Sequence, residues 1–593
     1  MYHPCLKSRR PPARSSPPEK SAHLLRDQKP GYVMLLLLLA CIPSQTPPPT
    51  PKELLQGIDE RGGLLPEKDP FGDDATRLIY LDQGWAPPET LWYYYADQGS
   101  ALMPYKMLLK LEQADSQALL MAPENLAKFR FLLQHPTPNN PDALPVGFSR
   151  HEDRVGFTCA ACHTGQLTYQ GTAIRIDGAP AQSDLIGFFY AIEASLSATL
   201  ADPAKLSRYA TATGQPEAEA RQSLQQSYDW FKDYNAVNKT TTPEGYARLD
   251  AIGRILNQVI RFTSSSANSL PPNAPASLPF LWDAPRHDYV QWTGFSGNAG
   301  PGALARNVGE VVGVYGEVKI QKYTTEEAAK AGYASSIQGH NLVAMEDSLR
   351  KLQSPLWPQE ILGPLDASLS ARGADIYSRE CAGCHAVLQR DDPKRKVTAM
   401  VTAITTVGTD ATSASNLVNA TAPSGILEGA VTPDGGVYPA RVPGIALLKD
   451  LDVRILSAQP TAVVQAIASA KLAGLEESQK QGDYKRKTEA DPMSELLSYK
   501  ARPLNGIWAT APYLHNGSVP DLYSLLLPPD QRPQTFVVGR LEYDPKRVGY
   551  RSDGSQPFVL DTRLTGNSNQ GHLFGTTLSE ADRLALLEYV KGL

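Results

Sequence analysis

Two cysteine pairs, each followed at once by a histidine, carry the strongest chemical signal in the sequence. They read Cys159-Ala160-Ala161-Cys162-His163 and Cys381-Ala382-Gly383-Cys384-His385. The C-x-x-C-H spacing is typical of haem c attachment, because two thiols on one turn can join the two vinyl groups of one haem and the next imidazole then lies under the iron. The sequence therefore predicts two covalent haem groups. The expected attachment residues and iron ligands are Cys159, Cys162, His163, Cys381, Cys384 and His385.

Other uses of a cysteine pair are a redox dithiol, half of a zinc site or a disulfide. The chain has six cysteines, and the two outside the motifs are Cys5 and Cys41. A zinc ribbon would need both pairs to converge, and a disulfide rarely bridges residues only three apart. The repeated motif therefore favours haem. Because haem is attached outside the cytoplasm, the motifs also predict an exported protein.

The amino-terminal segment is typical of a targeting sequence. Residues 1–30 carry seven Lys and Arg against two acidic residues, and an apolar run over 33–40 precedes Cys41. A basic region, a short apolar region and a small residue before the cut describe a secretory signal. The residues before Cys41 also fit a bacterial lipobox. We expect a signal over 1–40, a Pro-rich linker over 41–52 and lipidation of Cys41 in a Gram-negative bacterium. The periplasm or the outer membrane is then the predicted location, with the cell surface or secretion as alternatives.

Composition excludes several classes of protein. Of 593 residues, 42% are hydrophobic and 20% charged, which supports a packed core rather than disorder. The net charge of −5 argues against a nucleic-acid partner held by bulk charge. From Cys41 on the charge is −10, because the leader contributes +5 to the total of −5. The one apolar run is too short for a mature membrane span, so we expect membrane contact only through a lipid.

Helices must position the two motifs. Residues 370–380 have a helical pattern that leads into Cys381, and 578–593 form an amphipathic helix with Ser579 as its N-cap. Two such helices suit a carboxy-terminal cytochrome c haem domain over 366–593, which leaves 53–365 for an amino-terminal haem domain. The expected fold class is mainly α, with long irregular loops, two cytochrome c-like haem domains and few short strands. Helices are predicted over 91–97, 123–134, 182–200, 217–234 and 246–262, and strands over 166–169 and 311–316.

The second axial ligand decides between electron transfer and chemistry, because an iron with an open position can bind a small oxidant. His515 lies in an apolar segment with Gly and Pro residues, 130 residues after His385. We expect it to ligate the carboxy-terminal haem; Met400 and Met493 are the alternatives. His151 is only twelve residues before His163, and His287 is more typical of a core histidine. The sequence thus predicts one bis-histidine haem and one haem with an exchangeable site.

Several segments resemble the bacterial di-haem peroxidase superfamily and, within it, the haem-c rubber oxygenases. They are residues 80–85, 136–148, 155–158, 174–180, 304–316 and 505–518. The resemblance implies that the haem held by His163 binds O2 in an apolar pocket. It also implies that the haem held by His385 and His515 stays six-coordinate and supports it electronically. The implied reaction is cleavage of C=C bonds in polyisoprene or a related apolar alkene. Since a lipid on Cys41 would tether the protein, smaller alkenes such as unsaturated lipids are alternative substrates.

A tryptophan between the two haems is also implied by the resemblance. We choose Trp292, with Trp282 second, and expect His163 and Trp292 as catalytic residues; a plain core role stays open for either tryptophan. A calcium ion between the domains is a further expected cofactor.

Three other functions remain open at this stage. They are a di-haem peroxidase fed by a donor cytochrome, a non-enzymatic electron carrier, and modification of a protein partner by long-range electron transfer. A polar group beside the His163 haem would favour the peroxidase, because it could assist O–O cleavage, whereas apolar surroundings would favour the oxygenase.

Overall fold

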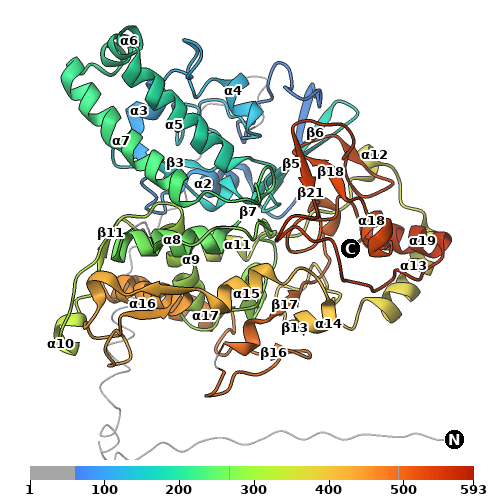
Figure 1. The fold of residues 1–593 in the computed structure, drawn as a ribbon. Helices are drawn as coiled ribbons and strands as arrows, with labels where there is room; N and C mark the ends of the chain where they lie inside the picture. The colour runs from blue at the N-terminus through green and yellow to red at the C-terminus, as the bar shows by residue number, and fades with distance from the viewer. Residues whose placement is uncertain (1–59, 266–267, 492) are drawn as a thin grey trace, which may run out of the picture. The chain divides into compact units, whose positions relative to one another are not determined.

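The computed structural model describes residues 60–265, 268–491 and 493–593 (Figure 1). These residues belong to one compact unit of the chain, 48–593. The predicted signal, linker and lipidation site at Cys41 lie outside the described residues. In the part of the chain that is described, no single helix is long and apolar enough to cross a membrane. One bent pair, Leu185–Ala201 with Pro203–Thr213, passes that test only when its two helices are counted together.

The fold is mixed rather than mainly α: it is 38% helical and 16% strand. Helices in the first part of the chain are α2 (Pro87–Tyr95), α3 (Tyr105–Lys110), α4 (Pro123–Lys128), α5 (Leu185–Ala201), α6 (Pro203–Thr213), α7 (Glu217–Val237), α8 (Ala251–Thr263), α9 (Gly302–Gly313), α10 (Glu326–Ala329), α11 (Gly339–Leu349) and α12 (Gln359–Leu362). Those in the second part are α13 (Ala367–Glu380), α14 (Ile404–Val407), α15 (Thr412–Asn419), α16 (Gly444–Ser457), α17 (Pro460–Leu472), α18 (Leu522–Leu525) and α19 (Glu580–Lys591).

Strands form small separate sheets of two or three members. The predicted fold class, with few short strands, underestimated this strand content. The three-stranded sheets are β1 (Arg77–Tyr80)-β6 (Thr172–Asp177)-β5 (Thr164–Tyr169), β2 (Met103–Pro104)-β4 (Arg154–Phe157)-β3 (Phe148–His151), and β16 (Lys480–Gln481)-β13 (Ala399–Ala403)-β17 (Ser498–Ala501). The two-stranded sheets are β7 (Arg248–Leu249) with β8 (Ala276–Ser277), β9 (Tyr289–Val290) with β10 (Ser296–Gly297), β11 (Val318–Lys319) with β12 (Ala334–Ser335), β14 (Thr421–Pro423) with β15 (Arg441–Pro443), β18 (Thr535–Val538) with β21 (Phe558–Asp561), and β19 (Tyr543–Asp544) with β20 (Gly549–Tyr550).

Most predicted elements are present, with shifted ends. The helices expected over 91–97, 182–200, 217–234 and 246–262 correspond to α2, α5, α7 and α8, and the strand over 166–169 falls in β5. The helix expected over 123–134 begins at Pro123 but ends at Lys128, because Arg130 takes a left-handed conformation at φ 59°. The strand expected over 311–316 is wrong, since its first residues close α9. Its valines follow the helical spacing of Leu304, Val308 and Val311, all buried.

The carboxy-terminal helix α19 packs side by side with α13, the helix that leads into the second cysteine motif (Figure 1). Ser579 caps α19 as predicted, because its hydroxyl accepts a hydrogen bond from the backbone N–H of Asp582. The helices approach closely at Gly373, where a Cβ atom would lie 2.0 Å from the carbonyl oxygen of Ala585. This packing fixes the position of Cys381 at the end of α13.

One hydrophobic cluster surrounds both motifs. It contains Trp85 and Trp282 from the first part of the chain, and Trp508 and Leu586 from the second. The core therefore crosses the predicted domain boundary between residues 365 and 366, and the division into two haem domains stays a prediction. Separate clusters lie between α5 and α7 and between α8, α9 and α16.

Candidate haem sites

The first motif occupies a tight turn between two strands. Strand β4 ends at Phe157, one 3-10 turn covers Cys159–Ala161, and β5 begins at Thr164. The backbone N–H of His163 closes the turn by donating to the carbonyl of Cys159 at 3.0 Å. Gly147 lies against this turn with φ +84°, where a Cβ atom would approach the backbone nitrogen of Ala161 to 2.0 Å. Glycine at that position therefore leaves room for the motif.

The second motif continues directly from a helix. The backbone N–H of Cys381 donates to the carbonyl of Tyr377 at 2.9 Å, and that of His385 donates to the carbonyl of Cys381 at 2.9 Å. Both motifs have the same support behind the histidine. The hydroxyl of Tyr93 donates to the carbonyl of His163 at 2.6 Å, and that of Tyr377 to the carbonyl of His385 at 2.9 Å.

Both motif histidines are oriented by a backbone carbonyl. Nδ1 of His163 lies 2.7 Å from the carbonyl oxygen of Pro279, and Nδ1 of His385 lies 2.6 Å from that of Arg502. Because a carbonyl only accepts, Nδ1 carries the hydrogen and Nε2 keeps the lone pair that a metal needs. Burial lowers the pKa of His163 to about 4 and also lowers the pKa of His385. Both imidazoles are thus neutral at pH 7.

A largely apolar cavity of about 480 Å³ opens at the second motif. That volume is in the ~300–1,000 Å³ range of cofactor pockets. Cys381, Cys384 and His385 line it together with two further histidines, His515 and His572. The structure therefore brings the predicted ligand His515 to the right cavity, beside a histidine that the sequence analysis passed over.

His572 is the histidine whose ring separation from His385 suits one shared iron. The two ring centroids are 6.4 Å apart. Two metal–nitrogen bonds of ~2 Å plus the ring radius on each side give about 6 Å for imidazoles on opposite sides of one metal. Burial lowers the pKa of His572 to about 4, which leaves a neutral ring. Its loop is held in place because the guanidinium of Arg532 donates to the carbonyls of Gly571 and His572.

His515 lies elsewhere on the same cavity. Its ring stacks on Tyr499 at 4.0 Å between centroids and lies edge-on to Trp292 at 6.5 Å. Its carbonyl accepts a hydrogen bond from the backbone of Ser277 at 2.8 Å. The geometry thus favours His572 over His515 as the partner of His385, and ligation by His515 stays a prediction. His572 has no motif around it, and its only sequence signal is its place shortly before the helix that packs on α13.

The remaining described histidines contact other residues, although Nε2 of His287 is buried without a hydrogen-bond partner. His151 bonds to Asp97 at 2.7 Å, His340 to Gln465 at 2.7 Å, and His287 contacts the amine of Lys500 at 3.3 Å. His135 lies beside Gly62, to which its backbone bonds. Met400 and Met493, the other candidate ligands, are absent from the lining of the described cavity.

Charged groups gather near the first motif. The carboxylate of Glu310 helps to raise the pKa of Cys159 and Cys162 to about 12, although burial of the thiols is the larger cause. Glu310 accepts from the side chain of Gln291 at 2.8 Å and lies 3.8 Å from the guanidinium of Arg306. Its side chain keeps 39% of its surface exposed, yet burial raises its pKa. Glu310 is therefore accessible but poorly hydrated.

The two candidate tryptophans lie in different places. Trp292 lines the cavity of the second motif and donates from Nε1 to the carbonyl of Ser277 at 2.9 Å. Trp282 is fully buried, donates to the carbonyl of Asn505 at 2.8 Å and stacks on Phe280 at 4.5 Å. A role for either between two haems stays a prediction.

Residues 498–537, which include His515, match the family model described as RoxA-like, cytochrome c-like. The uncharacterized protein y4iJ of Sinorhizobium fredii is 30% identical over 589 aligned residues, which cover 87% of this chain and 93% of that protein. The chain belongs to the RoxA-like family. A second uncharacterized protein of that organism, y4iM, is 48% identical over 71 residues, or 12% of this chain and 14% of its own.

Membership of the RoxA-like family indicates an oxidoreductase and implies covalently bound haem c. The residues present fit that group. All four thiols of the two motifs are free, and each motif supplies a neutral imidazole with a free Nε2. Nε of Arg502 is buried on the large cavity without a hydrogen-bond partner in the described structure. A buried cationic donor without a partner calls for an anionic acceptor, and haem carries two carboxylates.

Placement in the wider di-haem peroxidase superfamily and the number of haems stay predictions. No group of three His, Cys, Asp or Glu side chains within the described ranges is placed to hold a metal ion, and the calcium ion also stays a prediction.

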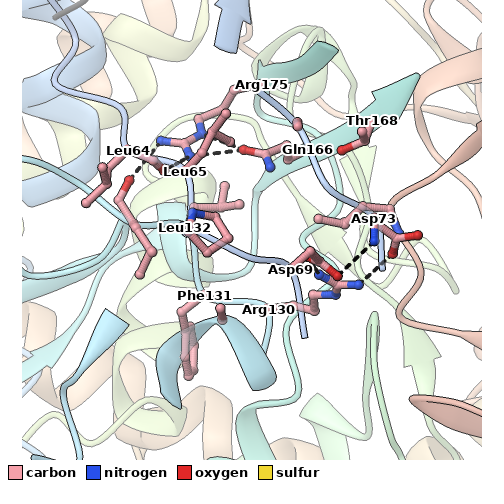
Figure 2. A pocket seen from close by; sticks show the side chains of 15 residues that line it. Leu64, Leu65, Asp69, Asp73, Arg130, Phe131, Leu132, Gln166, Thr168 and Arg175 are labelled. Atoms are coloured by element: carbon pink, nitrogen blue, oxygen red, sulfur yellow. Dashed lines mark hydrogen bonds and ion pairs between the residues drawn. The ribbon is translucent and has the colours of Figure 1, made fainter. Parts of the chain in front are cut away.

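A second, smaller cavity lies near the start of the described chain. Figure 2 shows the guanidinium of Arg130 pointing toward Asp69 and Asp73, and that of Arg175 toward Gln166. Arg130 pairs with both aspartates, with 2.7 Å to Asp73. The cavity volume of about 30 Å³ accommodates only about one or two water molecules. Arg130 is paired with the two aspartates, and Arg175 donates to Gln166 and to backbone carbonyls, so the cavity serves structure rather than substrate binding.

Proposed function

We propose that the chain is an exported di-haem c-type oxidoreductase in which the His163 site reacts with a small oxidant and the His385 site passes electrons. The observation that carries this proposal is the asymmetry of the two motifs. The ring centroids of His572 and His385 are 6.4 Å apart, whereas His163 has no ring contact with another histidine among the described residues. A six-coordinate iron is suited to electron transfer, and a five-coordinate iron can bind an oxidant.

Peroxide is the oxidant that the surroundings of His163 support best. Bound haem would supply the redox chemistry of its iron. Glu310 can hold a proton on its carboxyl oxygen closer to neutral pH than an ordinary glutamate, since burial raises its pKa. Reduction of hydrogen peroxide to two water molecules consumes two protons and two electrons. In this proposal Glu310 transfers protons, Arg306 stabilises developing negative charge, and a donor cytochrome delivers electrons through the His385 site.

Alkene cleavage by O2 is the second candidate, and membership of the RoxA-like family favours it. The substrate would be polyisoprene or a smaller apolar alkene, and His163 and Trp292 would be its catalytic residues. An oxygenase benefits from apolar surroundings that keep water and acid from bound oxygen. Because charged Glu310 and Arg306 lie near the first motif, this candidate comes second.

The two candidates differ in what they consume. Purified wild-type protein is incubated with hydrogen peroxide and a reduced c-type cytochrome, and separately with polyisoprene latex under 18O2. Rapid cytochrome oxidation without labelled carbonyl products supports peroxide reduction. Labelled carbonyl products without added peroxide or donor would replace it with the oxygenase. No spectral change of the reduced protein on addition of CO would leave only an electron carrier and refute both enzymes.

Export and lipidation are further parts of the proposal. They are supported by the basic leader, the apolar run before Cys41 and the site of haem attachment outside the cytoplasm. Cells that express the wild type and Cys41→Ser are labelled with a fatty acid analogue. Label in the membrane fraction of the wild type alone supports a lipoprotein, and equal labelling of both contradicts it.

A further inference from the structure

The carbonyls that orient the two motif histidines lie on segments far apart in sequence but close in space. His163 donates to Pro279, in the segment after β8, and His385 donates to Arg502, just after β17. The hydrogen bond from Nδ1 controls how basic Nε2 is as a ligand, and thereby influences the reduction potential of a bound iron. Whatever fixes these carbonyls therefore influences both sites.

The side chain of Arg502 joins the two segments. Its Nη2 donates to the carbonyl of Phe280 at 2.6 Å, one residue after Pro279. Its guanidinium carbon lies 3.5 Å from the centroid of the Phe280 ring. Trp282 stacks on the same ring at 4.5 Å and an interplanar angle of 19°. Arg502 thus holds the acceptor of His163 with its side chain and provides the acceptor of His385 with its own carbonyl.

The positive charge of Arg502 also acts on the first site. Its guanidinium is buried and bonds to the carbonyl of Phe280, the residue after the acceptor of His163. A fixed positive charge destabilises added positive charge nearby, so it disfavours the oxidised form of an adjacent iron. Both the position and the charge of Arg502 therefore influence the balance between oxidised and reduced iron, and so the reduction potential, at each site.

We propose that Arg502 is a positioning residue shared by the two proximal histidines, and that it sets the reduction potentials of both haems together. This inference rests on the proposed two-haem arrangement. A single residue would then keep the potentials of the reacting site and of the electron-passing site matched.

The test compares the wild type, Arg502→Met and Arg502→Lys in holoprotein by potentiometric titration with visible spectra. Arg502→Met should lower both potentials, because it removes the charge and the bond to Phe280. Arg502→Lys keeps a charge and one donor group, so it should lower both by less. The control is Arg454→Met, since Arg454 is also buried and bonds to two backbone carbonyls, those of Ala329 and Val431. It should leave both potentials unchanged.

The outcome separates this inference from the proposed function. Mass spectrometry of the wild type counts the haems, and fewer than two would refute the two-haem arrangement itself. With two haems present, a shift at one site only, or equal shifts in the Arg454 control, would overturn the role of Arg502. If Arg502→Met does not fold, Arg502→Lys and Phe280→Leu replace it. Phe280→Leu keeps the carbonyl but loses the ring, and should shift the potentials less than Arg502→Lys.

Discussion

The two C-x-x-C-H motifs share their immediate supports but differ in local secondary structure and in the charged or apolar groups nearby. In each, a tyrosine hydroxyl bonds to the carbonyl of the histidine and a backbone carbonyl bonds to its Nδ1. The first motif, however, is a turn between strands with charged Glu310 nearby, whereas the second ends a helix and opens on an apolar cavity that contains His572. The motif thus determines attachment and the proximal ligand. The rest of the fold determines what the second axial position can do.

The largest expected effect comes from removing His572. His572→Ala should convert the carboxy-terminal haem from low-spin to high-spin, because the covalent thioethers keep the ring while the sixth ligand is lost. His515→Ala is the matched variant on the same cavity and should leave the low-spin signal in place. Electron paramagnetic resonance of the two oxidised variants measures this. If only His515→Ala loses the low-spin signal, His515 and not His572 is the sixth ligand.

The next prediction tests the charged surroundings of the first motif. Glu310→Gln should reduce peroxide turnover by ~10²–10⁴, the usual contribution of a positioned proton donor or acceptor. Because burial raises the pKa of Glu310, the wild-type pH–rate profile should show an ionisation above the ordinary glutamate range that the variant lacks. Glu360→Gln, an exposed change on α12, is the control. Unchanged turnover in Glu310→Gln would show that Glu310 takes no part in proton transfer.

A third prediction concerns His515, which is buried and packs against Tyr499 and Trp292. Burial lowers its pKa from 6.5 to about 4. A histidine with a lowered folded-state pKa contributes stability above pH 6.5, and this is lost as the pH falls through 4. His515→Phe keeps a ring on Tyr499 but cannot be protonated. The fall in the free energy of unfolding from pH 7 to pH 4 should then be smaller by about 3 kcal/mol.

Urea unfolding at the two pH values provides this measurement. His340→Phe serves as the control, because His340 is bonded to side chains near the surface. An equal fall in the wild type and His515→Phe would show that His515 does not titrate as a buried neutral ring.

Local sequence was sufficient where short-range physics decides the structure. The two motifs, the cap at Ser579 and the helices α5 and α7 follow from spacing, capping and periodicity. Helix α4 ends early for a reason outside its own sequence, since Arg130 turns to pair with two aspartates some sixty residues earlier in the chain. The end of α9 was mistaken for a strand because valines favour strands, although their spacing is helical.

In the candidate site, too, some features follow from local sequence and others from contacts between distant segments. The proximal ligands His163 and His385 could be predicted because they adjoin their cysteines in sequence, and their ligation stays a prediction. His572 was passed over because its role depends on a ring separation set by the packing of distant segments. Likewise, nothing local to Glu310 or Arg306 connects them with Cys159, which lies some 150 residues earlier in the sequence.

The smallest effect concerns α19, the helix that packs directly on α13 beside the second motif. Ser579 accepts from the backbone N–H of Asp582 at 3.2 Å and caps α19, which packs on the helix leading into Cys381. Ser579→Ala should therefore cost about 1 kcal/mol. The cost should fall on the second site: in a urea titration, the low-spin signal of the bis-histidine haem should be lost at lower urea, while CO binding at the His163 haem persists. Thr325→Ala removes the equivalent cap of α10, which lies away from both motifs. In this variant neither haem signal should be lost before the other as the urea concentration rises. If Ser579→Ala shifts both haem signals together, the two sites unfold as one cooperative unit, and the contrast between them is one of ligation alone.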